Sequence, residues 1–396
     1  MIRHLLKLVW YRKRANALVM TEIFLSFLVL FGVVTFAVSA LLRWNDPLGF
    51  DWENIWVVRV DGEQSLDPLQ ENPLHGEMER LLRETKAFPQ VVGAAAGNTP
   101  PYSLSTTEGD WNIEGRRVHM TRDEVTDDFA SVMGMRVLRG RWFQPSDDAL
   151  GYIPVVVDSD LAKAMYGEKD PIGQKFDSDE KREWRVVGVV PPYRKDGELS
   201  RLGLNMMFER TALKDKTSRV LNIVLRVRPG TNAEFEEQLT RRLHEVVPNV
   251  NFRLRRMERM RDNVLKTYLS PLILAGIVAA FLMSMVALGL TGVLWQNVTR
   301  RTRELGLRRA LGASGPGVRS QILAEVALLA TLSVVVGVIV VLQLPLLGIF
   351  AFVTPAMFTA GLFGALAVIY AITLLCGLYP SWLASRLEPA EALRHE

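Results

Sequence analysis

The sequence contains almost no cysteine, since Cys376 carries the single thiol among 396 residues. An intramolecular disulfide is therefore excluded, and folded regions must be stabilised by burial of apolar side chains. The chain also lacks a phosphate-binding loop of the GxxxxGKS/T kind. The histidines are scattered without metal-ligand spacing, at His4, His75, His119, His244 and His395. We therefore expect no catalytic site, no metal and no cofactor held by this chain.

Two kinds of polar sequence are expected to be solvated. The acidic pairs Asp127-Asp128 and Asp147-Asp148 lie in loop-like sequence, and we interpret them as solvated turn residues rather than a cation site. The polar run 194–200 follows Pro191-Pro192 and predicts an exposed loop.

Long apolar runs are abundant, although the mean hydropathy of +0.13 is too low for a wholly membrane-embedded chain. The runs cover 23–42, 269–298, 322–353 and 354–384, and Glu325 is the only charged residue within them. Each is long enough to cross a bilayer as a helix. We expect transmembrane helices at 17–42, 268–298, 322–349 and 356–384, a loop at 299–321, an outer turn at 350–355 and a tail at 385–396. The run at 23–42 is longer than the apolar core of a signal peptide, and Arg43-Trp44-Asn45-Asp46 is not a small-residue cleavage site. We therefore interpret this run as a transmembrane helix rather than a cleaved signal peptide.

The distribution of arginine and lysine predicts the orientation. Basic residues cluster before the first run, between the second and third, and after the fourth. Such segments prefer the cytoplasm, so both termini are expected inside and residues 43–267 outside. The net charge of +4 is interpreted as orienting the helices on anionic lipid rather than as nucleic-acid affinity. Residues 1–16 predict either an amphipathic helix on the cytoplasmic leaflet or a simple orienting charge cluster.

Residues 43–267 predict a large α+β domain, with a possible division into two subdomains. Expected strands cover 53–60, 90–96, 118–121, 154–158, 184–190, 220–227 and 252–254. Expected helices cover 74–86, 161–166 and 232–247, with Thr231 as the N-cap of the last, and a charged helix at 255–266 leads into the second span. The predicted class is therefore a four-helix membrane protein with an α+β domain inserted between helices 1 and 2.

Five sequence blocks occur in an order that is typical of one family. They are GMRVLRGRWF at 134–143, PVVVDSDLAKAMYGEKDPIGQKF at 154–176, VVGVV at 186–190, the basic loop at 303–314, and PAEALR at 389–394. Together with one span before the domain and three after it, they resemble the permeases of MacB/FtsX-type ABC transporters. Residues 44–115 match that pattern less clearly.

The basic loop resembles the cytoplasmic coupling helix of those permeases. Its candidate ATPase-coupling residues are Arg303, Glu304, Leu305, Gly306, Leu307, Arg308, Arg309, Leu311 and Gly312. In a helix Leu307 and Leu311 share a face, Gly312 is a natural C-cap and Gly315-Pro316 a break. Charge alone fits a loop lying on anionic lipid, whereas the resemblance favours docking into an ATPase groove.

The resemblance implies an exporter permease in the bacterial inner membrane, working with a second permease, identical or paralogous, and often with a periplasmic membrane-fusion protein. Mg-ATP is expected on a separate cytoplasmic ABC ATPase, because this chain starts directly at the permease whereas macrolide exporters of this type carry a fused ATPase domain. Substrate is expected to be handled outside the bilayer, since Glu22 and Glu325 are the only acidic residues in the spans and both are expected near their cytoplasmic ends, paired to loop arginines.

Three other functions remain open at this point. The first is a lipoprotein-releasing permease, which a hydrophobic cradle on the outer domain would favour. The second is an FtsX-like regulatory protein that activates an extracytoplasmic enzyme without moving a substrate. A membrane-tethered enzyme is the third.

Overall fold

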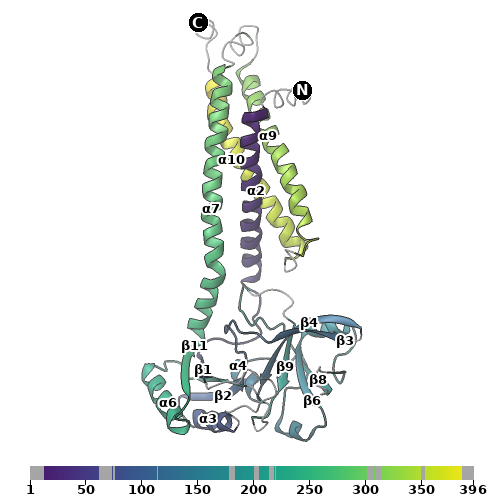
Figure 1. The fold of residues 1–396 in the computed structure, drawn as a ribbon, viewed down its shortest axis with the longest axis vertical. Coiled ribbons are helices and arrows are strands. Elements are labelled where there is room, and N and C mark those ends of the chain that lie inside the picture. Colours follow the sequence, from purple (N-terminus) through teal and green to yellow (C-terminus); the bar gives the residue numbers. More distant parts are fainter. Residues whose placement is uncertain are drawn as a thin grey trace. The chain divides into compact units, whose positions relative to one another are not determined.

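The computed structural model describes residues 13–61, 74, 76–113, 115–177, 183–199, 205–213, 218, 220–300, 307, 314–348 and 353–385. The chain divides into two compact units (Figure 1). One, the sheet unit, comprises Arg43–Tyr268, and the other, the helical unit, combines Met1–Leu42 with Leu269–Glu396. The expected N-terminal amphipathic segment at 1–12 and the tail at 386–396 lie outside the described residues.

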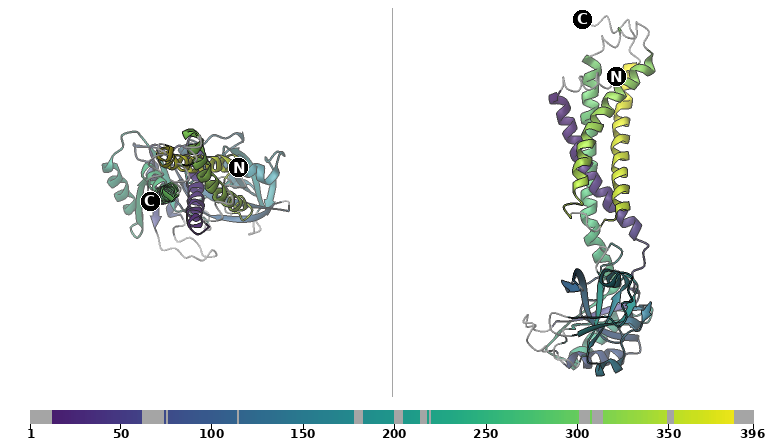
Figure 2. Two further views of the ribbon diagram at one scale, coloured as in Figure 1. Left: turned by 90° about the horizontal axis from the view of Figure 1, so that it is seen from above. Right: turned by 90° about the vertical axis from the view of Figure 1, so that its right-hand side faces the viewer.

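Four helices are long and apolar enough to cross a membrane: α2 (Lys13–Arg43), α7 (Met257–Arg300), α9 (Gly315–Gln343) and α10 (Pro355–Ser385). The views in Figure 1 and Figure 2 agree that α9 and α10 lie side by side. The core of the helical unit gathers apolar side chains from all four helices, among them Phe27, Leu290, Ala330 and Ile369. This is the packing expected of a multi-pass membrane protein, in which van der Waals contact rather than the hydrophobic effect holds the helices together.

The third membrane helix starts earlier than the sequence predicts. We expected it from residue 322 and took Gly315-Pro316 as a break, but α9 begins at Gly315. The Ser314 hydroxyl caps it by accepting a hydrogen bond from the backbone N–H of Gly317 at 3.3 Å. Proline suits the first turn of a helix because the N–H that it lacks would have no intrahelical partner there. Pro316 therefore helps to start the helix rather than to interrupt it.

The sheet unit is built on a single sheet with the strand order β11-β1-β10-β2-β4-β9-β6-β8-β5, to which β3 and β7 add at β4 and β8. The strands are β1 (Ile55–Asp61), β2 (Val91–Gly97), β3 (Glu108–Ile113), β4 (Arg116–Val125), β5 (Arg139–Gly140), β6 (Ile153–Asp158), β7 (Lys175–Asp177), β8 (Glu183–Val190), β9 (Met206–Arg210), β10 (Asn222–Val227) and β11 (Asn251–Arg256). The helices are α3 (Glu77–Lys86), α4 (Phe129–Met133), α5 (Ser159–Tyr166) and α6 (Ala233–Val246), with the 3₁₀ turn η1 at Pro145–Ala149. The predicted α+β class is confirmed.

The sheet is nearly divided into two lobes, as the irregular alternation of elements suggested. The first lobe contains β11, β1, β10 and β2, and the second contains β4, β9, β6, β8 and β5 with their added strands. Where the lobes meet, β2 and β4 share one residue pair, Gly97 with Val125. Each neighbouring ladder within a lobe is longer, such as the five pairs from Ile55–Arg226 to Arg59–Asn222 between β1 and β10. The junction between β2 and β4 is therefore the weakest pairing along the sheet's main path.

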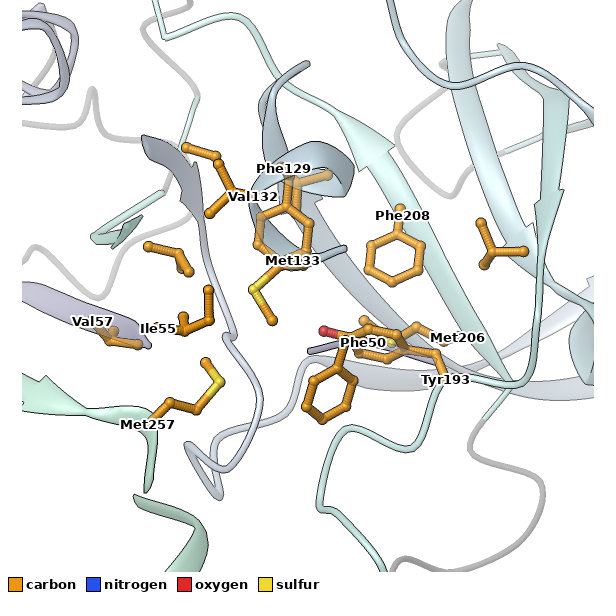
Figure 3. Close-up of a cluster of buried hydrophobic side chains, with 14 of the residues drawn as sticks. Phe50, Ile55, Val57, Phe129, Val132, Met133, Tyr193, Met206, Phe208 and Met257 are labelled. Carbon is orange, nitrogen blue, oxygen red and sulfur yellow. The ribbon is translucent and has the colours of Figure 1, made fainter. Parts of the chain in front are cut away.

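Three apolar cores stabilise the sheet unit. Helices α3 and α6 bury Leu81 and Leu239 on one face of the first lobe, and α5 buries Leu161 in the second. A third core lies between the lobes, where Tyr193 contacts the rings of Phe50 and Phe208 at centroid distances of 5.1 and 4.9 Å (Figure 3). Met257, the first residue of α7, belongs to the same core (Figure 3).

Several local predictions need correction. The N-cap of α6 is Asn232, whose side chain accepts from the N–H of Phe235, and not Thr231. The charged helix expected from residue 255 begins at Met257, because Arg255 and Arg256 pair with β1 as the end of β11. The sequence also did not predict β3, β5, β7, β9 and α4, which are short or carry little apolar alternation.

Candidate coupling site

The predicted ATPase-coupling stretch is largely outside the described residues. Arg303, Glu304, Leu305, Gly306, Arg308, Arg309, Leu311 and Gly312 all fall there. Leu307 is described, is helical, and has 52% of its side chain exposed. The prediction of a docking helix therefore stays a prediction, with Leu307 available at the surface of this chain.

The segments that join the sheet unit to its membrane helices form a second candidate coupling site. Residues 44–54 follow α2, and residues 257–268 are the first three turns of α7. The backbone N–H of Asn54 donates to Glu258 Oε1 at 2.8 Å. The guanidinium of Arg261 lies over the ring of Trp52 at 4.7 Å and over that of Trp44 at 5.9 Å. The two connections are therefore fastened to each other within the sheet unit.

The polar run after Pro191-Pro192 is not the exposed loop that its composition predicts. Arg194, Lys195 and Glu198 are only 9%, 1% and 5% exposed. Arg194 Nη1 donates to the carbonyl oxygens of Arg43 at 2.8 Å and Asp46 at 3.2 Å, and Nη2 donates to the carbonyl of Glu198. Burial of a guanidinium is tolerated here because backbone acceptors replace its water.

The same loop also contacts α7 through an ion pair. Arg261 Nε donates to Glu198 Oε1 at 2.7 Å, and Arg261 Nη2 lies 2.6 Å from the same oxygen in an ion pair. The two side chains are 19% and 7% exposed, so the pair is screened less than a surface pair. Removing one partner would leave a buried charge uncompensated, which costs more than the intact pair contributes.

A buried polar cluster lies under the loop. Asp123 is fully buried and accepts from the backbone N–H of Asn98 at 3.0 Å and Thr99 at 2.8 Å. Burial raises the pKa of Asp123 to about 6 despite those bonds and the charge of Lys195. Burial likewise lowers the pKa of Lys195, whose Nζ donates to the carbonyl of Ser105. The loop therefore rests on ionisable groups whose charged forms are poorly solvated.

Of the acidic pairs, Asp147 is less solvated than predicted, whereas Asp128 and Asp148 are exposed as predicted. Asp147 is buried and accepts from Arg141 at 2.6 and 2.8 Å and from the backbone N–H of Gln144 at 3.0 Å. Burial alone would raise the pKa of Asp147, but these bonds outweigh it and lower the pKa. Arg210 pairs with both Asp127 and Asp148. The described residues contain no group of three or more potential metal ligands, and the interpretation that the pairs are not a cation site stays a prediction.

The acidic residues of the membrane helices are half-buried. Among the described residues, Glu22 Oε2 has no hydrogen-bond partner and lies 2.7 Å from where a side chain on Gly289 would begin. The loop arginines expected to pair with Glu22 and Glu325 lie mostly outside the described residues, so that pairing stays a prediction.

A buried carboxyl in the second lobe predicts a pH-dependent stability. Asp158 caps α5 by accepting from the N–H of Leu161 at 2.8 Å, and burial raises its pKa to about 7. A carboxyl with a raised pKa stabilises the fold below its unfolded pKa of about 4, and this stabilisation is lost as the pH rises through about 7. Asp158→Asn keeps the cap but cannot ionise. We expect its melting temperature, relative to the parent chain in detergent, to rise as the pH goes from about 5 to 8. A pH-independent difference would contradict the raised pKa.

Comparison with family models gives two matches in the order of the two regions described above. Residues 17–242 match the MacB-like periplasmic core domain, and residues 276–389 match the FtsX-like permease C-terminal region. The first match alone covers more than half of the chain.

Curated relatives include macrolide export ATP-binding/permease proteins named MacB. That of Bordetella avium is 27% identical over 310 residues, which are 74% of this chain and 45% of the relative. MacB 2 of Aeromonas hydrophila is 28% identical over 283 residues, 69% of this chain and 43% of the relative. The chain thus spans less than half the length of these relatives.

Among solved structures, the periplasmic region of MacB from Actinobacillus actinomycetemcomitans aligns with 13% identity and a TM-score of 0.40, covering 56% of this chain and 97% of that one. The extracellular domain of the transporter YknZ from Gram-positive bacteria aligns with 14% identity and a TM-score of 0.36, covering 50% and 100%. On the two family-model matches, together with its four membrane helices and inserted α+β domain, the chain belongs to the MacB/FtsX-type ABC transporter permeases.

Proposed function

We propose that the chain is the permease subunit of an ABC-type exporter. In this function it passes the ATP-driven motion of a separate cytoplasmic ABC ATPase to the sheet unit, which lies outside the membrane and drives export. The permease pairs with a second copy or a paralogue, and the sheet unit docks on a periplasmic membrane-fusion protein. Both termini and the segment between α7 and α9 lie in the cytoplasm, as the arginine distribution predicts.

Helix α7 is the observation that carries this proposal. It is one helix of 44 residues, about 66 Å long at 1.5 Å per residue. A bilayer core of about 30 Å needs less than half of that length. Its first turns are anchored by Met257, Met260 and Val264 in a core of the sheet unit, and its last residue, Arg300, adjoins the predicted coupling loop. One continuous helix thus connects the predicted ATPase contact to the sheet unit.

The lipoprotein-releasing alternative has no support in the described part of the sheet unit. Its large exposed apolar side chains are Trp44, Val92, Leu104 and Leu138. They lie on separate elements, as scattered surface apolar residues commonly do, and not as a gathered cradle. No observation favours a regulatory role over export either, so export remains the function proposed.

Co-purification with an ABC ATPase from the same organism tests the function. The tagged chain is expected to retain that ATPase from solubilised membranes, and the purified pair to hydrolyse ATP. The chain purified alone is expected to show no turnover, because its sequence has no phosphate-binding loop. Turnover by the chain without the ATPase, or failure to retain any ABC ATPase, would contradict the proposal.

Orientation is checked in the same cells with single cysteines placed in a Cys376→Ser background. Thr106 and Ser320 are both exposed in the structure. An impermeant maleimide applied from outside is expected to label Thr106→Cys and to spare Ser320→Cys until the cells are opened. If only the Ser320→Cys variant were labelled in intact cells, the orientation would be opposite to the one proposed.

A further inference from the structure

The two lobes of the sheet unit differ in how the chain joins them to the membrane helices. In the first lobe, β1 follows the connection from α2, and β11 ends at Arg256 immediately before α7. No strand of the second lobe is continuous with either connection. The backbone pairing between the lobes is limited to Gly97 and Val125. Movement of the connections thus reaches the first lobe through the chain itself, whereas it reaches the second lobe only through non-covalent contacts, such as those of the core between the lobes.

The loop 191–199 supplies a further set of such contacts. It leaves the second lobe at the end of β8 and lies against the connection that follows α2. The backbone N–H of Arg194 donates to the carbonyl of Leu48 at 2.9 Å, and its guanidinium holds the carbonyls of Arg43 and Asp46. The approach is close, because a side chain on Gly49 would begin 2.6 Å from the carbonyl oxygen of Pro192.

The other end of the loop contacts the second connection. Glu198 accepts a hydrogen bond from Arg261 Nε and forms an ion pair with that guanidinium, and Arg261 lies on the second turn of α7. Tyr102 fills the space beside the loop, where its ring would meet any side chain on Gly197 at 2.4 Å. The backbone of Tyr102 is itself strained, because its φ of +59° lies in the left-handed region. The loop therefore contacts the α2 connection through Arg194 and the α7 connection through Glu198, four residues further along the chain.

The packing beneath the loop is not fully satisfied, which suits a segment that changes its arrangement. Three buried polar atoms of the loop itself have no hydrogen-bond partner among the described residues: Tyr193 OH, Asp196 Oδ1 and Glu198 Oε2. Buried polar atoms are nearly always paired in native proteins, so such a concentration marks a place with a function or an alternative arrangement.

We propose that the loop 191–199 is a strut that carries displacement of both membrane-helix connections to the second lobe. Arg194 is its attachment to the α2 connection, and the Glu198–Arg261 ion pair is its attachment to α7. The inference rests on the proposed coupling function. These three are positioning residues, which act through the strut and not by touching a substrate.

The test measures the distance between the lobes by pulsed electron paramagnetic resonance. Spin labels are placed at Gln238→Cys on α6 and Ala164→Cys on α5, both exposed, in the Cys376→Ser chain bound to its ATPase. The parent is expected to change its label distance between the nucleotide-free and ATP-bound states. Glu198→Gln is expected to lose most of that change while retaining the ATPase, because the neutral amide no longer pairs with the Arg261 charge.

Two further variants separate a coupling role from a structural one. The charge swap Glu198→Arg with Arg261→Glu is expected to restore part of the ATP-dependent change, which a merely destabilising substitution would not allow. Glu237→Gln, which breaks the exposed Glu237–Arg241 pair on α6, is the matched control and is expected to behave as the parent. Should Glu198→Gln fail to fold, the Arg261→Gln variant, which removes the other charge of the pair, is measured in its place, with the same loss expected.

The outcomes distinguish the two proposals. A Glu198→Gln variant that keeps the full ATP-dependent change overturns the strut. A parent that binds the ATPase but shows no change between the lobes also overturns it, while the permease function stands. A parent that binds no ABC ATPase defeats the permease function, and the strut falls with it.

Discussion

The substitution Leu307→Asp is expected to abolish retention of the ATPase by the solubilised chain. Leu307 is half-exposed in this chain, so a partner protein can cover it. On docking, the new carboxylate would be buried without a partner, which costs several kcal/mol if the groove is dry. At about 1.4 kcal/mol per tenfold, the complex would weaken by on the order of a hundredfold or more. The measurement is pull-down of the ATPase at matched expression, with titration of purified ATPase for the affinity.

The controls for this variant test the competing interpretation of a loop on anionic lipid. Glu304→Ala is expected to weaken the complex less if Glu304 stays exposed, and comparably if it pairs with an arginine of the ATPase. Both variants should insert normally, because the loop keeps its arginines. If Leu307→Asp retains the ATPase as well as the parent does, the loop is a lipid-facing element and the coupling proposal fails.

The membrane helices could be located from the sequence because the signal is local. An uncharged run as long as 23–42 is stable as a helix across a bilayer, and α2 includes it. The limits of the helices were less accurate. At α9 the residues Gly315 and Pro316 are helix breakers by type, and only their position directly after the Ser314 cap makes them part of the first turn.

The candidate site in the sheet unit could not be predicted from the sequence, because its partners are remote in the chain. A run containing Arg194, Lys195 and Glu198 predicts solvent exposure by composition. Arg194 donates to the carbonyl of Arg43, which is 151 residues away in the chain. Glu198 pairs with Arg261, which is 63 residues away. The predicted exposure of Asp147 was wrong for another reason. Its partner Arg141 is only six residues away, but a buried ion pair leaves no periodic pattern in the sequence.

The second large effect is expected at Gly140, in the first of the family-like blocks. Gly140 pairs with Gly188 between β5 and β8 and has a φ of +70°. A side chain on it would begin 2.2 Å from the carbonyl oxygen of Val187, which is backbone and cannot swing away. Gly140→Ala therefore combines a strained backbone with a steric clash. We expect a loss of about 2 kcal/mol or more of unfolding free energy, from about 1 kcal/mol or more for each effect.

Two other glycines separate those effects. Gly230 has a φ of +85° and open space around it, so Gly230→Ala carries the backbone strain alone, about 1 kcal/mol. Gly188 has no positive φ, but a side chain on it would begin 2.2 Å from the carbonyl oxygen of Arg141, so Gly188→Ala carries the clash alone, about 1–3 kcal/mol. Denaturant unfolding of the three variants, followed by tryptophan fluorescence, is expected to rank Gly140→Ala as the most damaging and Gly230→Ala as the least. If Gly140→Ala cost no more than Gly230→Ala, the close approach of β5 to β8 would not constrain that position, and the glycines of this block would need another explanation than packing.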